Sequence, residues 1–226
     1  MSSDICDINA PNCRQTKFLL LLVSLMALMV LEPLLYDRTR IKFLIDIFFT
    51  VILFTSIYAV SDKKGTTLVA ILLALPKLGT TWANNFVTHP LLYFLDSLFG
   101  IIFIGYIIIL ILRHIFRQED VSSETIYGAI VVYILLGLMW VFLYNITEIL
   151  HPGSFSVAAV LDAESKKVLY FFSFVTLTTL GYGDITPVSA PARSLAMVEA
   201  IVGQMYLAVL IARLVGMHIS QSMMKK

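Results

Sequence analysis

The residues most able to do chemistry lie near the C-terminal end, in the segment Thr176–Asp184, which reads T-L-T-T-L-G-Y-G-D. Gly181 and Gly183 flank Tyr182 there, directly after an apolar stretch, Val168–Leu180, that is too short to cross a bilayer. Non-helical backbone at membrane depth is tolerated only where it lines water or is buried in protein. We therefore expect the apolar stretch to enter the membrane as a short helix and the chain to return in extended form.

The overall composition places that segment in a membrane protein. Of 226 residues, 59% are hydrophobic and 14% are charged, whereas a soluble domain has about half apolar and about a quarter charged residues. A net charge of +1 provides no basic surface for nucleic acid. Two cysteines are too few for a disulfide framework, and the sequence has no zinc-ligand spacing, nucleophile elbow or phosphate loop. We therefore expect a membrane protein that is not an enzyme.

Long apolar runs predict how often the chain crosses the bilayer. A helix needs about 20 apolar residues to span the hydrocarbon core. Short polar turns separate most of the runs, and one run is weaker because it contains Pro76 and Lys77. The sequence predicts six transmembrane helices, in the runs Lys17–Tyr36, Ile41–Val60, Thr66–Trp82, Leu91–Leu112, Glu124–Leu150 and Pro191–Ile219.

The glycine-rich segment resembles the selectivity filter of potassium channels, whose core is T-V-G-Y-G. Thr179, Gly181, Tyr182 and Gly183 match this core, and Leu180 stands where the family most often has valine. The chain thus resembles the potassium channel superfamily of tetrameric pore-loop channels. More loosely, the whole chain looks like the bacterial six-span members of that superfamily.

This resemblance implies passive conduction of potassium. In the family, the ion exchanges its water shell for a ring of backbone carbonyls supplied by four chains, so the chain is expected to form a homotetramer. The implied filter is Thr179, Leu180, Gly181, Tyr182 and Gly183, with K⁺ at the first four of these. The Thr179 hydroxyl would lie at the cavity end, whereas Tyr182 and Leu180 would point outward.

The resemblance also assigns parts to the last three helices. Glu124–Leu150 would be the outer helix, Lys166–Thr178 the pore helix and Pro191–Ile219 the inner helix. Asp162 and Glu164 precede the pore helix, where negative charge suits the helix dipole. The expected fold is an all-α membrane protein of six transmembrane helices, with a re-entrant pore helix and filter between the last two. The expected divisions are an N-terminal segment (1–16), a four-helix transmembrane domain (17–112), a linker (113–123), a pore domain (124–219) and a short tail (220–226).

Three polar residues near the filter are expected to support it. Asp184 would anchor the outer end of the filter, and four copies would make an acidic mouth that attracts cations. Thr178 is expected to support the filter from the end of the pore helix. Glu148, near the end of the outer helix, either hydrogen-bonds backbone behind the filter, as the resemblance implies, or is simply exposed at the interface.

Two inner-helix positions have alternative interpretations. Gly203 follows Gly183 by the spacing at which the family has a hinge glycine. Close packing of Gly203 and Ala200 against a neighbouring helix is the alternative. Gln204 would face the cavity or a neighbouring subunit.

Glu199 lies one turn before Gly203, where a charge is costly unless it is paired or protonated. It is expected to hydrogen-bond the pore helix, at Thr176 or Thr178, or to add negative potential near the cavity. We favour the first of these roles.

The first four predicted helices lack the charges of a voltage sensor. The fourth run, Leu91–Leu112, contains no Lys or Arg, and its one charge is Asp96. Steep voltage gating needs about 3–4 gating charges per subunit. We therefore expect these four helices to give the protein no steep voltage dependence. Glu32 and Lys77 are expected to snorkel from near a helix end, with pairing of Lys77 to Asp46 or Asp96 as the alternative.

The distribution of Lys and Arg favours an N-terminus inside, and we expect a multi-pass protein of the plasma (inner) membrane. The expected partners are three further copies and membrane lipids, with no nucleic acid and no cofactor beyond permeant K⁺. Whether a separate regulatory subunit exists is an open question.

Two alternative functions are considered. One alternative is a non-selective or sodium-conducting channel, against which the intact G-Y-G argues. A second is a receptor or transporter, but the repeated halves typical of transporters are absent from the sequence.

Overall fold

A computed structural model describes residues 11–34, 40–61, 64–87, 89–118, 122–157 and 167–224. Among these residues the chain is almost entirely helical. The helices and strands, in chain order, are α1 (Pro11–Leu34), α2 (Arg40–Ala59), α3 (Lys64–Ala83), α4 (Pro90–Arg117), α5 (Ser123–Leu150), β1 (Phe155–Val157), α6 (Lys167–Leu177), β2 (Ile185–Pro187) and α7 (Ala190–Met224).

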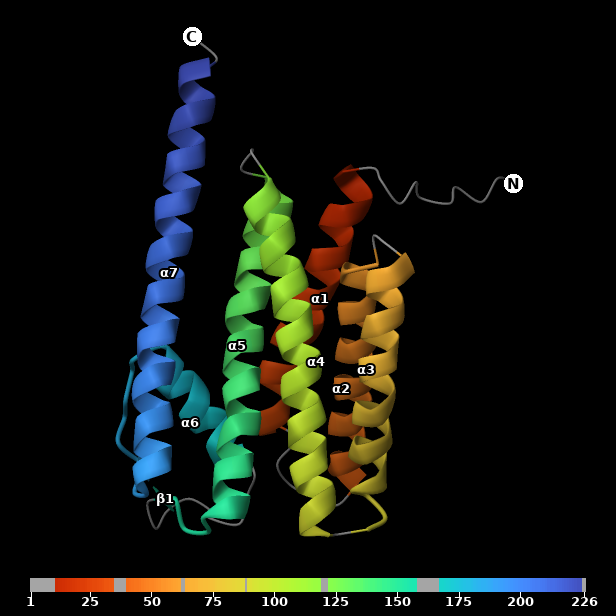
Figure 1. The fold of residues 1–226 in the computed structure, drawn as a ribbon, viewed down its shortest axis with the longest axis vertical. Helices are drawn as coiled ribbons and strands as arrows, with labels where there is room; N and C mark the ends of the chain where they lie inside the picture. Colours follow the sequence, from red (N-terminus) through yellow and green to blue (C-terminus); the bar gives the residue numbers. More distant parts are fainter. Residues whose placement is uncertain are drawn as a thin grey trace, which may run out of the picture.

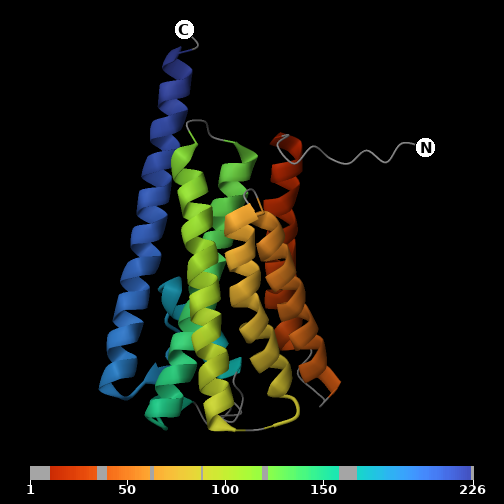
Figure 2. The same ribbon diagram turned by 45° about the vertical axis from the view of Figure 1, so that its right-hand side comes forward.

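The long helices lie side by side along one axis, and successive ones alternate in direction (Figure 1). The start of α1 and the end of α7 consequently lie at the same end of the molecule, whereas α6 and the strands lie toward the other end. Helix α5 is central, because it contacts α1, α4, α6 and α7. In both views α7 lies at one edge of the bundle (Figure 2), and many of its large apolar side chains are exposed.

Four helices among the described residues are long and apolar enough to cross a membrane: Lys64–Ala83, Pro90–Arg117, Ser123–Leu150 and Ala190–Met217. The chain is therefore an integral membrane protein. Shorter apolar helical segments lie at Thr16–Val30 in α1 and Asp46–Ala59 in α2. The sequence-based count of six spans stays a prediction, since it depends on these two helices as well.

The expectation of an all-α fold is wrong in one detail. β1 and β2 form a two-stranded antiparallel ribbon, in which Phe155 pairs with Pro187 and Val157 with Ile185. The ribbon joins the loop that follows α5 to the chain that follows the glycine-rich segment. Three residues per strand are too few for an alternating apolar pattern to reveal them in the sequence.

Several helices extend beyond the predicted divisions of the chain. α4 continues to Arg117, so the first part of the predicted linker, 113–123, is helical. α1 begins at Pro11 within the predicted N-terminal segment, and α7 reaches Met224 within the predicted tail. An apolar run locates the membrane crossing, but a helix continues into the polar interface as long as its backbone stays hydrogen-bonded. Asp162 and Glu164, expected before the pore helix, lie outside the described residues.

Candidate functional site

The segment after α6 has an unusual backbone at alternate residues. In Thr179–Gly183, here called the filter segment, Thr179, Gly181 and Gly183 have φ values of 58°, 57° and 80°, and the two residues between them do not have positive φ. Positive φ is strained for a β-branched residue such as threonine. Positive φ thus recurs at every second residue of the filter segment, and its role as a ring of carbonyl ligands for a dehydrated cation stays a prediction.

The two glycines are needed for their backbone angles and not for space. A Cβ built on Gly181 or Gly183 would meet no atom within 4 Å. Their positive φ, by contrast, lies in the left-handed region that L-residues with a side chain avoid.

Backbone hydrogen bonds tie the filter segment to the end of α6. The N–H of Thr179 donates to the Thr176 carbonyl at 2.9 Å, and the N–H of Leu180 donates to the Val175 carbonyl at 2.9 Å. The Thr178 hydroxyl donates to a carbonyl one turn earlier in α6 at 2.7 Å. Thr178 therefore lies at the junction of α6 and the filter segment, and its expected role in supporting the filter stays a prediction. Any displacement of the α6 terminus will move the filter backbone with it.

Two side chains of the filter segment lack a full set of neighbours within this chain. The Tyr182 ring stacks on Phe171 of α6, with ring centroids 6.2 Å apart and an interplanar angle of 2°. Even so, Tyr182 is 66% exposed and Leu180 is 55% exposed. Asp184, next along the chain, accepts a hydrogen bond from the N–H of Ile185 at 3.0 Å.

Glu148 binds backbone, but not the backbone of the filter segment. Its carboxylate accepts hydrogen bonds from the N–H groups of Gly153 at 2.7 Å and Ser154 at 3.0 Å. The Ser154 carbonyl in turn accepts the N–H of Val188 at 2.8 Å, and the Ser154 hydroxyl lies 2.9 Å from that of Ser189. Glu148 therefore closes the turn after α5, which is bonded to the start of α7.

Gly203 is a point of close approach between α7 and α6. A Cβ built on Gly203 would lie 2.4 Å from the Leu177 carbonyl oxygen and 3.0 Å from the Leu177 side chain. The carbonyl belongs to the last residue of α6, which is fully buried and also accepts a hydrogen bond from the Tyr133 hydroxyl at 3.3 Å. Of the two interpretations of this glycine, the geometry supports close packing, with α6 as the neighbour.

Glu199 is fully buried between three helices. Its Oε1 lies 2.6 Å from the Ser173 hydroxyl of α6, and its Oε2 accepts a hydrogen bond from the Tyr144 hydroxyl of α5. The Ser173 hydroxyl also lies 2.9 Å from the Gly137 carbonyl oxygen of α5. Glu199 thus bonds α6, the predicted pore helix, but at Ser173 and not at Thr176 or Thr178.

The Gln204 side chain contacts Thr179, the first residue of the filter segment. Its side-chain Nε2 donates to the Thr179 hydroxyl at 3.4 Å, on the exposed side of α7. α7 therefore contacts α6 through Glu199 and Gly203, and it contacts the filter segment through the hydrogen bond of Gln204 to Thr179.

Among the first four helices, α1–α4, the expectation that Lys77 snorkels from near a helix end is wrong. Lys77 is only 4% exposed, and its Nζ lies 2.6 Å from Oδ1 of Asp96 in α4. Thr81 donates to the same oxygen at 2.8 Å. Lys77 Nζ also lies 4.6 Å from the ring centroid of Phe142 in α5, so this buried cation touches the predicted outer helix.

The other two charged residues of the first helices have different outcomes. Asp46 accepts a hydrogen bond at 2.6 Å from the side-chain amide of Asn85, in the turn between α3 and α4. The Glu32 side chain lies outside the described part of the chain.

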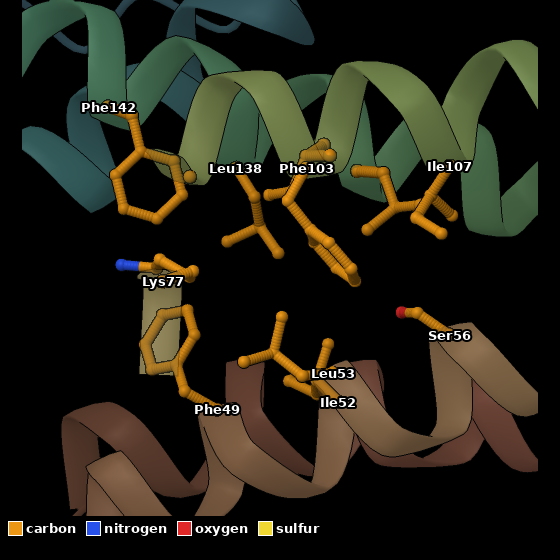
Figure 3. A pocket seen from close by; sticks show the side chains of 12 residues that line it. Phe49, Ile52, Leu53, Ser56, Lys77, Phe103, Ile107, Leu138 and Phe142 are labelled. Atoms are coloured by element: carbon orange, nitrogen blue, oxygen red, sulfur yellow. The ribbon is translucent and has the colours of Figure 1, made fainter. Parts of the chain in front are cut away.

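A small cavity of about 20 Å³ adjoins Lys77 between α2, α3, α4 and α5. Figure 3 shows Lys77 and Phe142 at one end of it, Ser56 at the other, and apolar side chains between them. The Ser56 hydroxyl is buried without a hydrogen-bond partner. The volume is near the minimum for one water molecule, and apolar atoms form nearly all of the wall, so the cavity gives no indication of a ligand site.

Sequence reasoning missed the partners of the predicted site residues. Ser173 and Tyr144 bind Glu199, and Ser154 and Ser189 continue the contacts of Glu148. One signal was available for Ser173, because it lies between Phe172 and Phe174 in the mainly apolar α6, and a buried hydroxyl requires a hydrogen-bond partner. The loop serines offered no comparable signal.

Comparison with protein families matches residues 159–219 to a family described as ion channel. The match covers about a quarter of the chain, from the segment before α6 through most of α7, and includes the filter segment. No curated protein and no solved structure matches the chain. The family and the bundle of apolar helices agree on a channel and not an enzyme, as the sequence predicted. Residues 159–219 are thus similar to the ion channel family, and this match supports the resemblance to potassium channels that the sequence shows.

Proposed function

We propose that four copies of this chain form a potassium-selective channel in the plasma membrane, with the filter segments surrounding a common axis. The observation that carries the proposal is the alternation of positive φ at Thr179, Gly181 and Gly183. It supports a row of carbonyl oxygens in each chain, and a ring of such oxygens is what replaces the hydration shell of K⁺. One chain supplies only one wall of that ring.

The exposure of the filter segment and of α7 supports assembly. Tyr182 and Leu180 are more than half exposed in the single chain, as are several large side chains of α7, among them Met197, Ile201 and Met205. An apolar surface next to the filter segment is the expected contact with neighbouring chains, which would also complete the packing behind the filter.

Selectivity is tested by ion replacement on purified protein in planar bilayers. We expect the reversal potential to shift by more than about 59 mV under bi-ionic K⁺/Na⁺ conditions, the value for a tenfold permeability ratio of monovalent ions. Gly181→Ala should reduce this shift, because a side chain at positive φ costs roughly 1–2 kcal/mol in every chain. Gly105→Ala in α4, where an added Cβ meets nothing within 4 Å, is the matched control. A near-zero shift in the wild type would favour the non-selective alternative.

Voltage dependence is expected to be shallow. The one positive side chain buried in the middle of α3 is Lys77, and its ion pair with Asp96 at 2.6 Å has no net charge to move. Moving one elementary charge through the membrane field yields about 2.3 kcal/mol per 100 mV, so a neutral pair contributes little. A series of voltage steps from about −100 to +100 mV, which includes the resting potentials of roughly −40 to −90 mV, should give open probabilities that change less than about threefold. Strong sigmoidal activation would contradict this expectation.

A further inference from the structure

Lys77 is fixed in place by a cluster of donors from α3 around one carboxylate oxygen of α4. Its Nζ lies 2.6 Å from Oδ1 of Asp96. The same oxygen accepts hydrogen bonds from the hydroxyls of Thr80 at 3.1 Å and Thr81 at 2.8 Å. A charge inside a membrane bundle is costly, so a residue of this kind is a functional candidate by default. The cluster therefore raises the question of what the fixed cation contacts.

The other contact of this cation is the ring of Phe142 in α5. Nζ lies 4.6 Å from the ring centroid, and Figure 3 shows the amine and the ring next to each other at one end of the small cavity. The Phe142 side chain is buried, and a Cβ built on Gly100 of α4 would lie 2.7 Å from its ring. The attraction between a cation and an aromatic ring is strongest where both are desolvated. Phe142 is therefore held by α3 and α4 together.

The opposite face of α5 contacts α6. Successive residues of a helix are about 100° apart, so Tyr144 points about 200° away from Phe142. The centroid of the Tyr144 ring lies 5.1 Å from that of Phe172 in α6. Nearer the start of α5, a Cβ built on Gly137 would lie 2.7 Å from the ring of Phe174 in α6. Coupling between distant sites is carried by packed side chains of this kind, so a displacement of Phe142 will be passed through α5 to α6.

We propose that Lys77 is a positioning residue for conduction, which holds Phe142 and, through α5, keeps α6 and the filter segment in the conducting arrangement. Its effect on conduction rests on the proposed channel function. The filter segment follows α6 because the N–H groups of Thr179 and Leu180 bond carbonyls near the end of that helix. The first four helices then act on the pore by steadying α6, and no charge has to cross the membrane field.

Hydrogen–deuterium exchange of the purified protein tests this role without any current. Lys77→Met keeps an apolar stem and removes the charge, so the amides of α6 should exchange at least about fivefold faster than in the wild type. The matched control is Lys17→Met, because Lys17 is also a buried lysine and its ring contact, at 5.1 Å, is with Tyr58 of α2. The control should change α6 exchange less than about twofold. Unchanged exchange of α6 in folded Lys77→Met protein would overturn the proposal.

A double-mutant cycle with Phe142→Leu tests the route from Lys77 to α6. Adding Lys77→Met to Phe142→Leu should accelerate α6 exchange less than about twofold further, because the ring contact is already lost. An undiminished effect of Lys77→Met in that background would show that the ion pair with Asp96 acts alone, which also overturns the proposal. Lys77→Gln, which keeps a donor for Asp96, takes the place of Lys77→Met in both measurements if the latter does not fold.

Single-channel recording in bilayers measures the consequence for conduction. Lys77→Met should lower the open probability at least about fivefold while the amplitude of each opening is kept, because α6 is loosened and not rebuilt. Lys77→Arg, which restores the charge, should recover most of the open probability. Faster α6 exchange with an unchanged open probability would overturn the proposal as well. A wild type without K⁺-selective current would contradict the proposed function instead, and the exchange measurements would still decide whether Lys77 holds α6.

Discussion

Gly203→Ala is expected to lower single-channel conductance at least tenfold or to abolish current. The new methyl group would lie 2.4 Å from the Leu177 carbonyl oxygen, well inside ordinary van der Waals contact. That oxygen is backbone at the end of α6, so relief requires a movement of the pore helix or of α7. Because the N–H groups of Thr179 and Leu180 bond α6 within 2.9 Å, the filter segment will be displaced as well.

The protein should also lose about 1–3 kcal/mol of stability, as is typical of an overpacked core. The matched control is Gly216→Ala in the same helix, where an added Cβ meets no atom within 4 Å. Alanine in a helix interior is favoured over glycine by roughly 0.5–1 kcal/mol, so this control should be neutral or slightly stabilising. Thermal unfolding and single-channel recording in bilayers measure both quantities.

The recording also separates close packing from a hinge at Gly203. Loss of a hinge would change how often the channel opens while each opening keeps its normal amplitude and K⁺/Na⁺ selectivity. Displacement of the filter segment would instead change the amplitude and the reversal potential. Folded Gly203→Ala protein with wild-type amplitude and selectivity would show that the contact with Leu177 is not required for conduction.

Glu199→Gln and Glu199→Ala are expected to differ sharply, although both remove the carboxylate. The hydroxyl of Ser173 has one proton but lies within 2.9 Å of two acceptors, Glu199 Oε1 and the Gly137 carbonyl. A neutral carboxylic acid resolves this conflict, because its own proton can be donated to Ser173, whose proton then goes to Gly137. Tyr144 donates to the other oxygen. A glutamine amide can make the same set of bonds.

We therefore expect Glu199→Gln to keep conductance within about threefold of the wild type. Glu199→Ala should lower it at least tenfold and cost about 2–4 kcal/mol of stability, since it leaves the Tyr144 and Ser173 hydroxyls without their partner and opens a void. Reconstituted K⁺ flux and thermal unfolding provide the measurements. Equal loss in both variants would show that a negative charge is what matters, and equal retention would show that the network is dispensable.

The positions of the helices could be predicted from the sequence because the bilayer imposes a length. Glu124–Leu150 was predicted as a helix, and α5 begins one residue earlier and ends at the same residue. The short apolar stretch before Gly181 likewise predicted α6. The β1–β2 ribbon could not be predicted, because its pairing depends on where the two loops meet and not on local residue patterns.

Side-chain partners were harder to predict than helices, because they depend on how each helix is rotated. Glu199 meets Tyr144 across 55 residues and Ser173 across 26, and no apolar pattern fixes those rotations. For Lys77, the sequence offered Asp96 as one of two partners, and packing against Phe142 shows why snorkelling does not occur. The roles of the filter residues stay predictions, supported by the backbone angles of Thr179–Gly183.

Glu148, Ser154 and Ser189 are joined by hydrogen bonds that hold the end of α5 and the start of α7 together. If α7 tilts, it therefore pivots about this end, and its length acts as a lever arm. From Ser189 to Arg213 the lever arm is about 36 Å long at 1.5 Å per residue. Tilting α7 by about 5° therefore moves Arg213 by about 3 Å. The filter segment ends two residues before β2 and so lies close in sequence to the pivot. The two hydrogen bonds from Arg213 to the end of α4 thus restrain α7 far from this anchored end.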